Sequence, residues 1–208
     1  EIASCLVGSE MCIRDSRLPA LWSESAPPYI IPTLQPNRQF LRLTDMERKL
    51  IELLRHRSLT MATAESCTGG NIAHRITLVP GASDVFSGAV VSYSNRVKAD
   101  ILGVSMENLR LYGAVSEPVV REMAEGVCRA LGVDCAVATS GIAGPGGGTP
   151  DKPVGMVWMA VHVRGFQTQS AVYRFDGDRA TVIETATTAA LKMLHDRLVA
   201  VFSNPGVQ

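Results

Sequence analysis

Apolar residues recur every three or four positions in several stretches of the chain, a spacing that places them on one face of a helix. The longest such stretch lies near the C-terminus, where Val182, Ala186, Ala190 and Leu194 follow helical spacing. The predicted helices cover residues 45–57, 96–102, 117–131 and 178–202, and a further helix begins near residue 72.

Shorter runs of apolar and β-branched residues separate these helices and have the length of strands. The last two runs are joined by residues 164–166, which predicts a hairpin. The predicted strands cover residues 60–64, 85–93, 134–139, 154–163 and 168–175. Alternating strands and helices with one hairpin predict an α/β fold, in which helices cover both faces of a mixed sheet.

Residues 1–44 differ from the rest of the chain because they lack a sustained apolar period. They contain five prolines, and the segment Ser4–Ser16 resembles translated sequencing-adaptor DNA. We therefore expect a disordered or non-native N-terminal extension over residues 1–44, one domain over residues 45–203 and a short tail over residues 204–208.

The charge balance and the cysteines exclude several classes of function. Twenty basic and twenty acidic residues give a formal net charge of zero, so the whole chain attracts neither nucleic acid nor an anionic membrane surface. The five cysteines form no CxxC pair and have no histidine at metal-ligand spacing, which indicates neither a zinc site nor a redox pair. Without a secretory signal or a membrane-length apolar run, we expect a cytoplasmic protein with a small-molecule partner, no metal and no cofactor.

Two glycine-rich loops follow predicted strands, AESCTGG at Ala64–Gly70 and SGIAGPGGG at Ser140–Gly148. In open α/β sheets ligands bind outside the carboxyl ends of strands, and glycines leave backbone N–H groups accessible to phosphate oxygens. Neither loop completes a Walker motif or GxGxxG. The glycines therefore indicate either a small-molecule site or simply tight turns with positive φ.

Between these loops lies a segment with residues suited to nucleophilic catalysis. Ser83 precedes the second predicted strand, Tyr93 ends it, and Lys98 lies one turn into the next helix. A desolvated lysine with a lowered pKa can deprotonate a serine, and a tyrosine hydroxyl can position the proton. The segment contains no GxSxG elbow, and the trio functions only if the fold brings its members together.

Several motifs, in order along the chain, resemble the CinA C-terminal domain family. They are TAESCTGG (Thr63–Gly70), PGAS with a nearby phenylalanine (Pro80–Ser83 and Phe86), SYSNRVKADILGV (Ser92–Val104), GAVSEPVV (Gly113–Val120), SGIAGPGGGTPDKPVG (Ser140–Gly155) and GDR (Gly177–Arg179). The resemblance covers residues 45–203 and implies a three-layer α/β/α fold with a mixed, mostly parallel sheet.

The resemblance implies a nicotinamide-nucleotide amidase of pyridine nucleotide (NAD) recycling. Such an enzyme hydrolyses the carboxamide of nicotinamide mononucleotide to nicotinate mononucleotide and ammonia without a metal. By the same resemblance Ser83 is the nucleophile, Tyr93 and Lys98 form the base system, and Arg179 either holds the substrate phosphate or orients the site. The family is often fused behind a larger N-terminal domain, and the short residues 1–44 favour the stand-alone amidase.

The resemblance also implies a nucleotide pocket with N–H donors for a phosphate or an oxyanion. Glu65 is interpreted either as a substrate-orienting acid or as the partner of a helix dipole. The expected pocket residues are Glu65, Ser66, Thr68, Gly69, Gly70, Asn95, Ser140, Gly141, Ala143 and Gly144.

Two alternatives remain open at this stage. Ser66 or Cys67 is an alternative nucleophile, because AESCTGG presents a hydroxyl and a thiol at a predicted helix N-terminus. The alternative function is a catalytically silent nucleotide-binding or partner module, since the family also carries a competence and damage-inducible name. The missing basic stripe argues against nucleic-acid binding, and a homodimer is expected by analogy.

Overall fold

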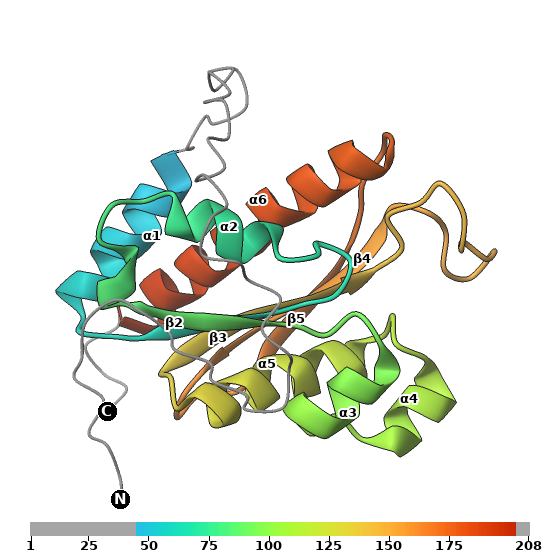
Figure 1. Cartoon of the computed structure of the whole chain (residues 1–208), viewed down its shortest axis with the longest axis horizontal. Helices are drawn as coiled ribbons and strands as arrows, with labels where there is room; N and C mark the ends of the chain where they lie inside the picture. Colours follow the sequence, from blue (N-terminus) through green and yellow to red (C-terminus); the bar gives the residue numbers. More distant parts are fainter. Residues whose placement is uncertain (1–44, 203–208) are drawn as a thin grey trace, which may run out of the picture. The chain divides into compact units, whose positions relative to one another are not determined.

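Five strands form a single sheet in the order β2-β1-β3-β4-β5, shown in the computed structural model of Figure 1. The strands are β1 (Met61–Glu65), β2 (Phe86–Val91), β3 (Cys135–Gly141), β4 (Met156–Val163) and β5 (Gln169–Arg174). The structure describes residues 45–202, so the expected extension (1–44) and tail (204–208) lie outside the described residues.

The sheet is mixed, as the sequence predicts. β1 pairs in parallel with both β2 and β3, whereas β3 with β4 and β4 with β5 pair antiparallel. Only β4 of these five strands therefore runs against the others. The carboxyl ends of β1, β2 and β3 meet at one edge, where parallel strands of an open sheet present their ligand-binding loops.

Helices cover both faces of the sheet, which gives three layers (Figure 1). One core contains the apolar residues of α1, α2 and α6, and the other those of α3, α4 and α5. The second face carries buried alanines such as Ala62, Ala64 and Ala136, whose small side chains let α5 pack closely. The helices are α1 (Asp45–His56), α2 (Asn71–Thr77), α3 (Asn95–Leu102), α4 (Met106–Tyr112), α5 (Glu117–Leu131) and α6 (Arg179–Phe202), with a short 3-10 helix, η2, at Ala82–Asp84.

The apolar pattern predicts no helix at residues 106–112, where α4 lies. Only Leu109 of α4 is buried, so the segment has no apolar stripe long enough to predict a helix. Tertiary contacts hold α4, because Glu122 on α5 accepts hydrogen bonds from the Ser105 backbone N–H (2.8 Å) and the Asn108 side-chain amide (2.6 Å). Ser105 in turn caps the helix N-terminus.

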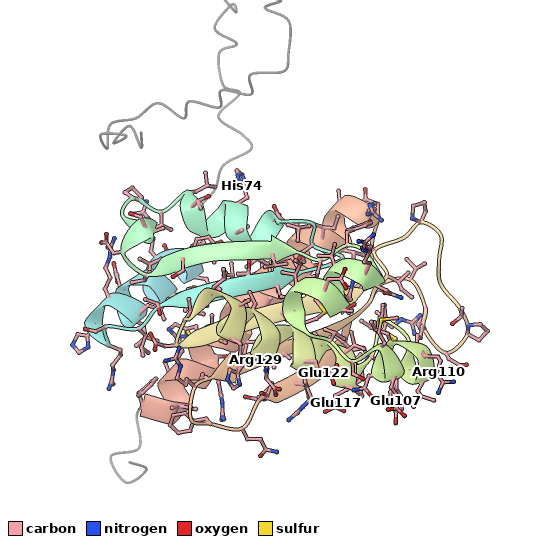
Figure 2. The ribbon with its side chains drawn as sticks, turned by 60° about the horizontal axis from the view of Figure 1, so that its bottom comes forward. His74, Glu107, Arg110, Glu117, Glu122 and Arg129 are labelled. Carbon is pink, nitrogen blue, oxygen red and sulfur yellow. The ribbon has the colours of Figure 1, made fainter. Side chains whose placement is uncertain are left out.

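The helices of this layer also carry charges of both signs. Glu107 and Arg110 lie on α4, and Glu117, Glu122 and Arg129 on α5 (Figure 2). α5 thus has a charged side and an apolar side packed toward the sheet, whereas α4 packs against α5 through Leu109. Within residues 45–202 no helix combines the length and hydropathy needed to cross a membrane.

Gly126 allows the close approach of α5 to α3. A Cβ atom at this position would lie 1.9 Å from the Leu102 carbonyl oxygen. Gly→Ala usually stabilises a helix interior by about 1 kcal/mol, but we expect Gly126→Ala to lower the free energy of unfolding by about 1–3 kcal/mol through overpacking. Urea unfolding measures this change in the free energy of unfolding. Ala130→Gly, on the exposed face of α5, is the comparison variant. An unchanged or higher stability of Gly126→Ala would contradict the close packing.

Candidate active site

A small cavity lies at the sheet edge where β1, β2 and β3 end. It has a volume of about 200 Å³. Its walls come from the two glycine-rich loops, the residues after β2 and the first residue of α6, so segments far apart in the sequence meet here. The lining residues are Ser66, Cys67, Tyr93, Gly141, Ala143 and Arg179.

Lys98 approaches this cavity from inside the protein. Its side chain is almost completely buried, with 1% exposed, although lysine is a residue that rarely leaves solvent. Its Nζ donates to the Ser66 Oγ at 3.1 Å and to the Ser92 carbonyl oxygen at 2.6 Å. No carboxylate of residues 45–202 forms a salt bridge with Nζ.

Burial lowers the pKa of Lys98 below the ordinary lysine value, because the ammonium form loses its hydration. In the neutral form the amine keeps two N–H bonds and gains a lone pair. One N–H continues to donate to the Ser92 carbonyl, and the lone pair then accepts the Ser66 O–H. Ser66 and Lys98 thus lie within hydrogen-bond reach of each other, which is the geometry that a serine nucleophile and a general base require.

Arg179 and Tyr93 form the outer wall of the cavity. The Arg179 Nη2 donates to the Tyr93 hydroxyl at 2.8 Å, and its Nη1 donates to the Gly144 carbonyl at 2.9 Å. No carboxylate among the described residues forms an ion pair with this guanidinium. The mouth of the cavity therefore carries an uncompensated positive charge, suited to an anion.

Comparison with known proteins identifies the family. The sequence profile of the CinA C-terminal domain matches residues 43–198. The chain belongs to the CinA C-terminal domain family. This agrees with the motif resemblance and with the three-layer arrangement described above.

The chain is similar to two curated CinA-like proteins. It is 51% identical over 151 residues to one from Akkermansia muciniphila, which covers 73% of this chain and 36% of that protein. It is 46% identical over 153 residues to one from Thermotoga maritima, covering 74% and 37%. The chain thus spans about a third of the length of these curated relatives.

Solved structures of similar proteins include shorter chains. A competence-damaged protein (CinA) superfamily protein from Klebsiella pneumoniae is 35% identical with a TM-score of 0.73, covering 77% of this chain and 99% of that one. A competence/damage-inducible protein from Agrobacterium tumefaciens is 38% identical with a TM-score of 0.72, covering 75% and 94%. The CinA domain therefore has known structural relatives of nearly its own size.

Ser83 of this CinA domain lies away from the cavity. It belongs to η2, before β2, whereas Tyr93 and Lys98 follow that strand, so the six residues of β2 separate them by roughly 20 Å. Ser83 instead lines an exposed hollow with Pro80 and Phe86, and no basic side chain lines that hollow. The expected pairing of Ser83 with Lys98 is therefore not formed. The partner of Lys98 is Ser66, the alternative nucleophile.

Cys67, the other alternative, is a poor nucleophile in this position. Burial raises the pKa of its thiol to about 12, with the nearby Glu65 charge acting in the same direction. The thiol is therefore protonated at neutral pH, although it lines the cavity beside Ser66. Of the two residues, the geometry favours Ser66.

Only some of the expected pocket residues of the CinA domain face the cavity. Gly141 and Ala143 line it, and Gly144 contributes the carbonyl that holds Arg179. Ser140 is fully buried, and its hydroxyl donates to the Ala114 carbonyl at 2.8 Å, so it braces the neighbouring loop. Asn95 is the exposed first residue of α3 and is absent from the cavity lining.

The remaining expected pocket residues use their polar groups inside the protein. The Gly69 N–H donates to the Ser66 carbonyl at 3.1 Å, and the Gly70 N–H donates to the Glu65 carboxylate at 3.0 Å. Thr68 is 3% exposed and donates its hydroxyl to the same carboxylate at 2.7 Å. Glu65 is fully buried, so it is not placed to orient a substrate directly. The helix-partner interpretation of Glu65 agrees with these contacts.

The Ser92 carbonyl is a functional group that sequence reasoning missed. It holds the Lys98 amine, but a backbone acceptor carries no residue-type signal. The only available indication was its position, at the carboxyl end of β2 next to Tyr93.

Proposed function

We propose that the CinA domain hydrolyses the carboxamide of nicotinamide mononucleotide to nicotinate mononucleotide and ammonia. The observation that carries this proposal is the Ser66 hydroxyl, which lies 3.1 Å from a buried lysine at the edge of a small cavity. A general base within hydrogen-bond reach activates serine for acyl transfer. The family resemblance supports the choice of a pyridine nucleotide carboxamide as the substrate.

In the proposed mechanism neutral Lys98 takes the Ser66 proton while Oγ attacks the carboxamide carbon. The tetrahedral intermediate collapses when the Lys98 ammonium returns a proton to the amide nitrogen, so the C–N bond breaks and ammonia leaves. Water then attacks the acyl-enzyme with Lys98 again as base, which releases the carboxylate and restores the serine. The Ser92 carbonyl keeps the amine aimed at Oγ through both steps.

The size and charge of the cavity support a substrate with one buried ring and an outer anion. Its volume of about 200 Å³ is below the range of pockets that enclose whole drug-sized ligands. We infer that the pyridine ring enters the cavity and that the ribose and phosphate stay near its mouth. Arg179 lines that mouth and offers its charge to the phosphate.

We expect Arg179→Gln to raise KM for nicotinamide mononucleotide about 10–100-fold, because the substrate phosphate loses a charge-assisted hydrogen bond. Because nicotinamide riboside has no phosphate, its kcat/KM should change by less than about threefold. Steady-state assays with both substrates measure the difference, with Arg174→Gln, an exposed arginine on β5, as the control. An equal loss of kcat/KM for both substrates would instead show that Arg179 orients Tyr93 or the glycine-rich loop at Gly144.

The direct test of the function is release of ammonia and nicotinate mononucleotide by the wild-type protein. We expect turnover of the mononucleotide without added metal. If the protein binds nicotinate mononucleotide but produces no ammonia over the pH range in which it stays folded, the amidase proposal fails. That result would favour a nucleotide-binding module, which the same glycine loop and arginine could provide.

A further inference from the structure

Glu65, the last residue of β1, places a fully buried carboxylate directly before Ser66. Five groups donate hydrogen bonds to it, and all five come from nearby backbone amides or hydroxyls. In all five contacts the carboxylate oxygens are the acceptors. The donors are the N–H groups of Gly70 (3.0 Å), Ile72 (3.0 Å) and Ala73 (2.9 Å) and the hydroxyls of Thr63 (3.1 Å) and Thr68 (2.7 Å).

These contacts close the loop that carries Ser66. The chain leaves β1 at Glu65, turns through Gly69 and Gly70 with φ of 63° and 98°, and enters α2. Gly70 occupies the N-cap position but has no side chain to cap the helix. Glu65 supplies the missing acceptor from the other end of the loop, so both ends of the Ser66–Gly70 loop are tied to one carboxylate.

A chain of hydroxyls extends this clamp to β3. The Thr68 hydroxyl donates its single proton to Glu65, so the Thr139 hydroxyl, 2.8 Å away, must donate to Thr68. The Ser66 backbone N–H donates to the Thr139 carbonyl at 3.0 Å. The nucleophile loop is thus attached to the neighbouring strand as well as to α2.

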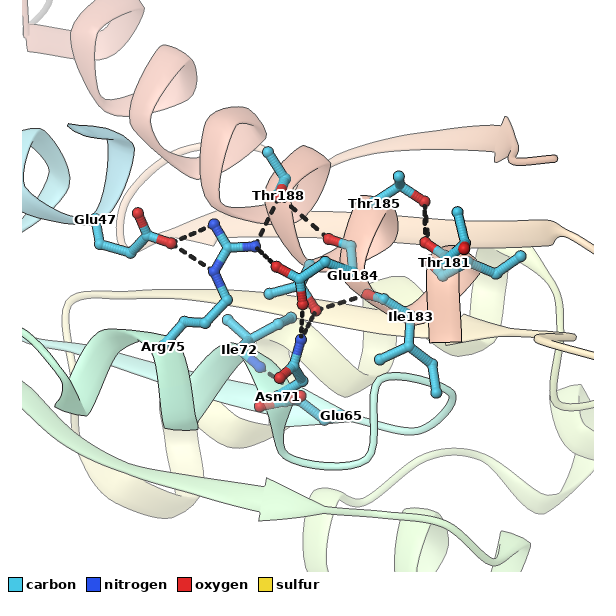
Figure 3. Close-up of polar contacts among 12 residues, drawn as sticks. Glu47, Glu65, Asn71, Ile72, Arg75, Thr181, Ile183, Glu184, Thr185 and Thr188 are labelled. Carbon is cyan, nitrogen blue, oxygen red and sulfur yellow. Dashed lines mark hydrogen bonds and ion pairs between the residues drawn. The ribbon is translucent and has the colours of Figure 1, made fainter. Parts of the chain in front are cut away.

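The helix at the far end of the loop is itself anchored. Arg75 on α2 forms an ion pair with Glu47 of α1 and another, at 2.8 Å, with Glu184 of α6 (Figure 3). It also donates to the Thr188 hydroxyl at 2.7 Å, and the Asn71 amide donates to Glu184 at 3.0 Å. The loop therefore spans two fixed elements, and a change at Glu65 acts on the loop first.

We propose that Glu65 is a positioning residue, which sets the place of the Ser66 hydroxyl relative to Lys98 by clamping the Ser66–Gly70 loop. The proposal rests on the amidase function above and adds a residue that does not touch the substrate. Ser66 must stay within hydrogen-bond distance of a lysine whose amine is held separately by Ser92. A shift of the loop would break this contact without changing the anion-binding mouth.

The test is Glu65→Gln, which keeps the size of the side chain but replaces one acceptor oxygen by an NH2 that faces N–H donors. We expect kcat to fall about 10²-fold, the effect of an ångström-scale displacement of a catalytic group. KM should stay within about threefold of wild type. The matched control is Glu184→Gln, which also contacts α2 but not the loop, and its kcat should stay within about twofold.

Two results would overturn the proposal. One is a Glu65→Gln protein with wild-type kcat, and the other is a raised KM at unchanged kcat, which would make Glu65 a substrate contact. If Glu65→Gln does not fold, Thr68→Val removes one donor and keeps the carboxylate; we expect kcat to fall about 5-fold, as for one hydrogen bond. An unchanged kcat in Thr68→Val would then overturn the clamp.

A second measurement separates this proposal from the amidase function. Amide hydrogen exchange of residues 66–73 should be faster in Glu65→Gln than in wild type, because the clamped N–H groups lose an acceptor oxygen. In Thr68→Val exchange should also be faster, because the loop loses the hydroxyl that ties it to the Glu65 carboxylate. If wild type releases no ammonia, the amidase function fails while the exchange result still decides the clamp. Unchanged amide exchange in a folded variant would reject the proposal that Glu65 clamps the loop.

Discussion

Ser66→Ala should lower kcat for nicotinamide mononucleotide by at least about 10³-fold, whereas Ser83→Ala should stay within about twofold of wild type. The reason is geometric, because the Ser66 hydroxyl lies 3.1 Å from Lys98 while Ser83 lies before β2, at the other end of that strand. Removing the nucleophile eliminates the acyl-enzyme and leaves only the contribution of substrate binding.

The two variants are compared by ammonia release, and each serves as the other's control. Ser66→Ala should still bind nicotinate mononucleotide with wild-type affinity, since Arg179 and the glycine loop are unchanged. Trapping the pyridine acyl group on Ser66 by rapid quench and mass spectrometry would identify the nucleophile directly. Loss of activity in Ser83→Ala with turnover retained in Ser66→Ala would reverse the assignment.

Lys98→Met should also abolish turnover, by about 10³-fold or more, because the serine loses its base. Stability should not fall. The folded state binds the Lys98 proton more weakly than the unfolded state does, so at any pH below the unfolded pKa protonation of this lysine works against folding. Methionine fills a similar volume without that penalty. Thermal unfolding and ammonia release measure the two effects, and Lys192→Met, at an exposed position, is the control.

The same base predicts the pH dependence of the wild type. The neutral amine is the active form, so kcat/KM should rise with pH through the pKa of Lys98 and then level off. Burial lowers that pKa, which puts the rise below the pH at which an exposed lysine titrates. A kcat/KM that falls as the pH rises through this range would contradict Lys98 as the base.

Most of the fold follows from local patterns in the sequence. The apolar period of residues 117–131 predicts α5 with the bounds that the structure shows, and the other elements agree to within about two residues. The strand order is not predicted by these patterns, because β1 pairs with both β2 and β3 and only the packed sheet shows this. The segment Met106–Tyr112 is the exception, because α4 depends on Glu122 of another helix rather than on its own periodicity.

The candidate site was predicted in its parts but not in its pairing. Tyr93, Lys98, Arg179 and both glycine loops meet at one sheet edge, as their places after strands suggest. The residue types and the resemblance both favour Ser83 as the nucleophile, although Ser83 precedes its strand and so lies at the opposite edge. The signal that could have excluded it is the direction of the strand, since residues before and after a strand lie at its two ends.

Hydrophobic periodicity and chain direction are local properties, so the layers, the mixed sheet and the sheet edge that carries the candidate site could all be predicted from the sequence. Which serine contacts Lys98 follows from the packed structure alone, as does the set of loop and helix groups that donate to the buried Glu65 carboxylate. The hydrogen bond between Ser66 and Lys98 joins the loop after β1 to α3, which follows the neighbouring parallel strand β2. The hydrogen bond from Ala73 to Glu65 closes the turn between β1 and α2. The burial of Lys98 and its distance to each serine are set only when the helices and strands pack together, so the sequence pattern cannot select one hydroxyl among several.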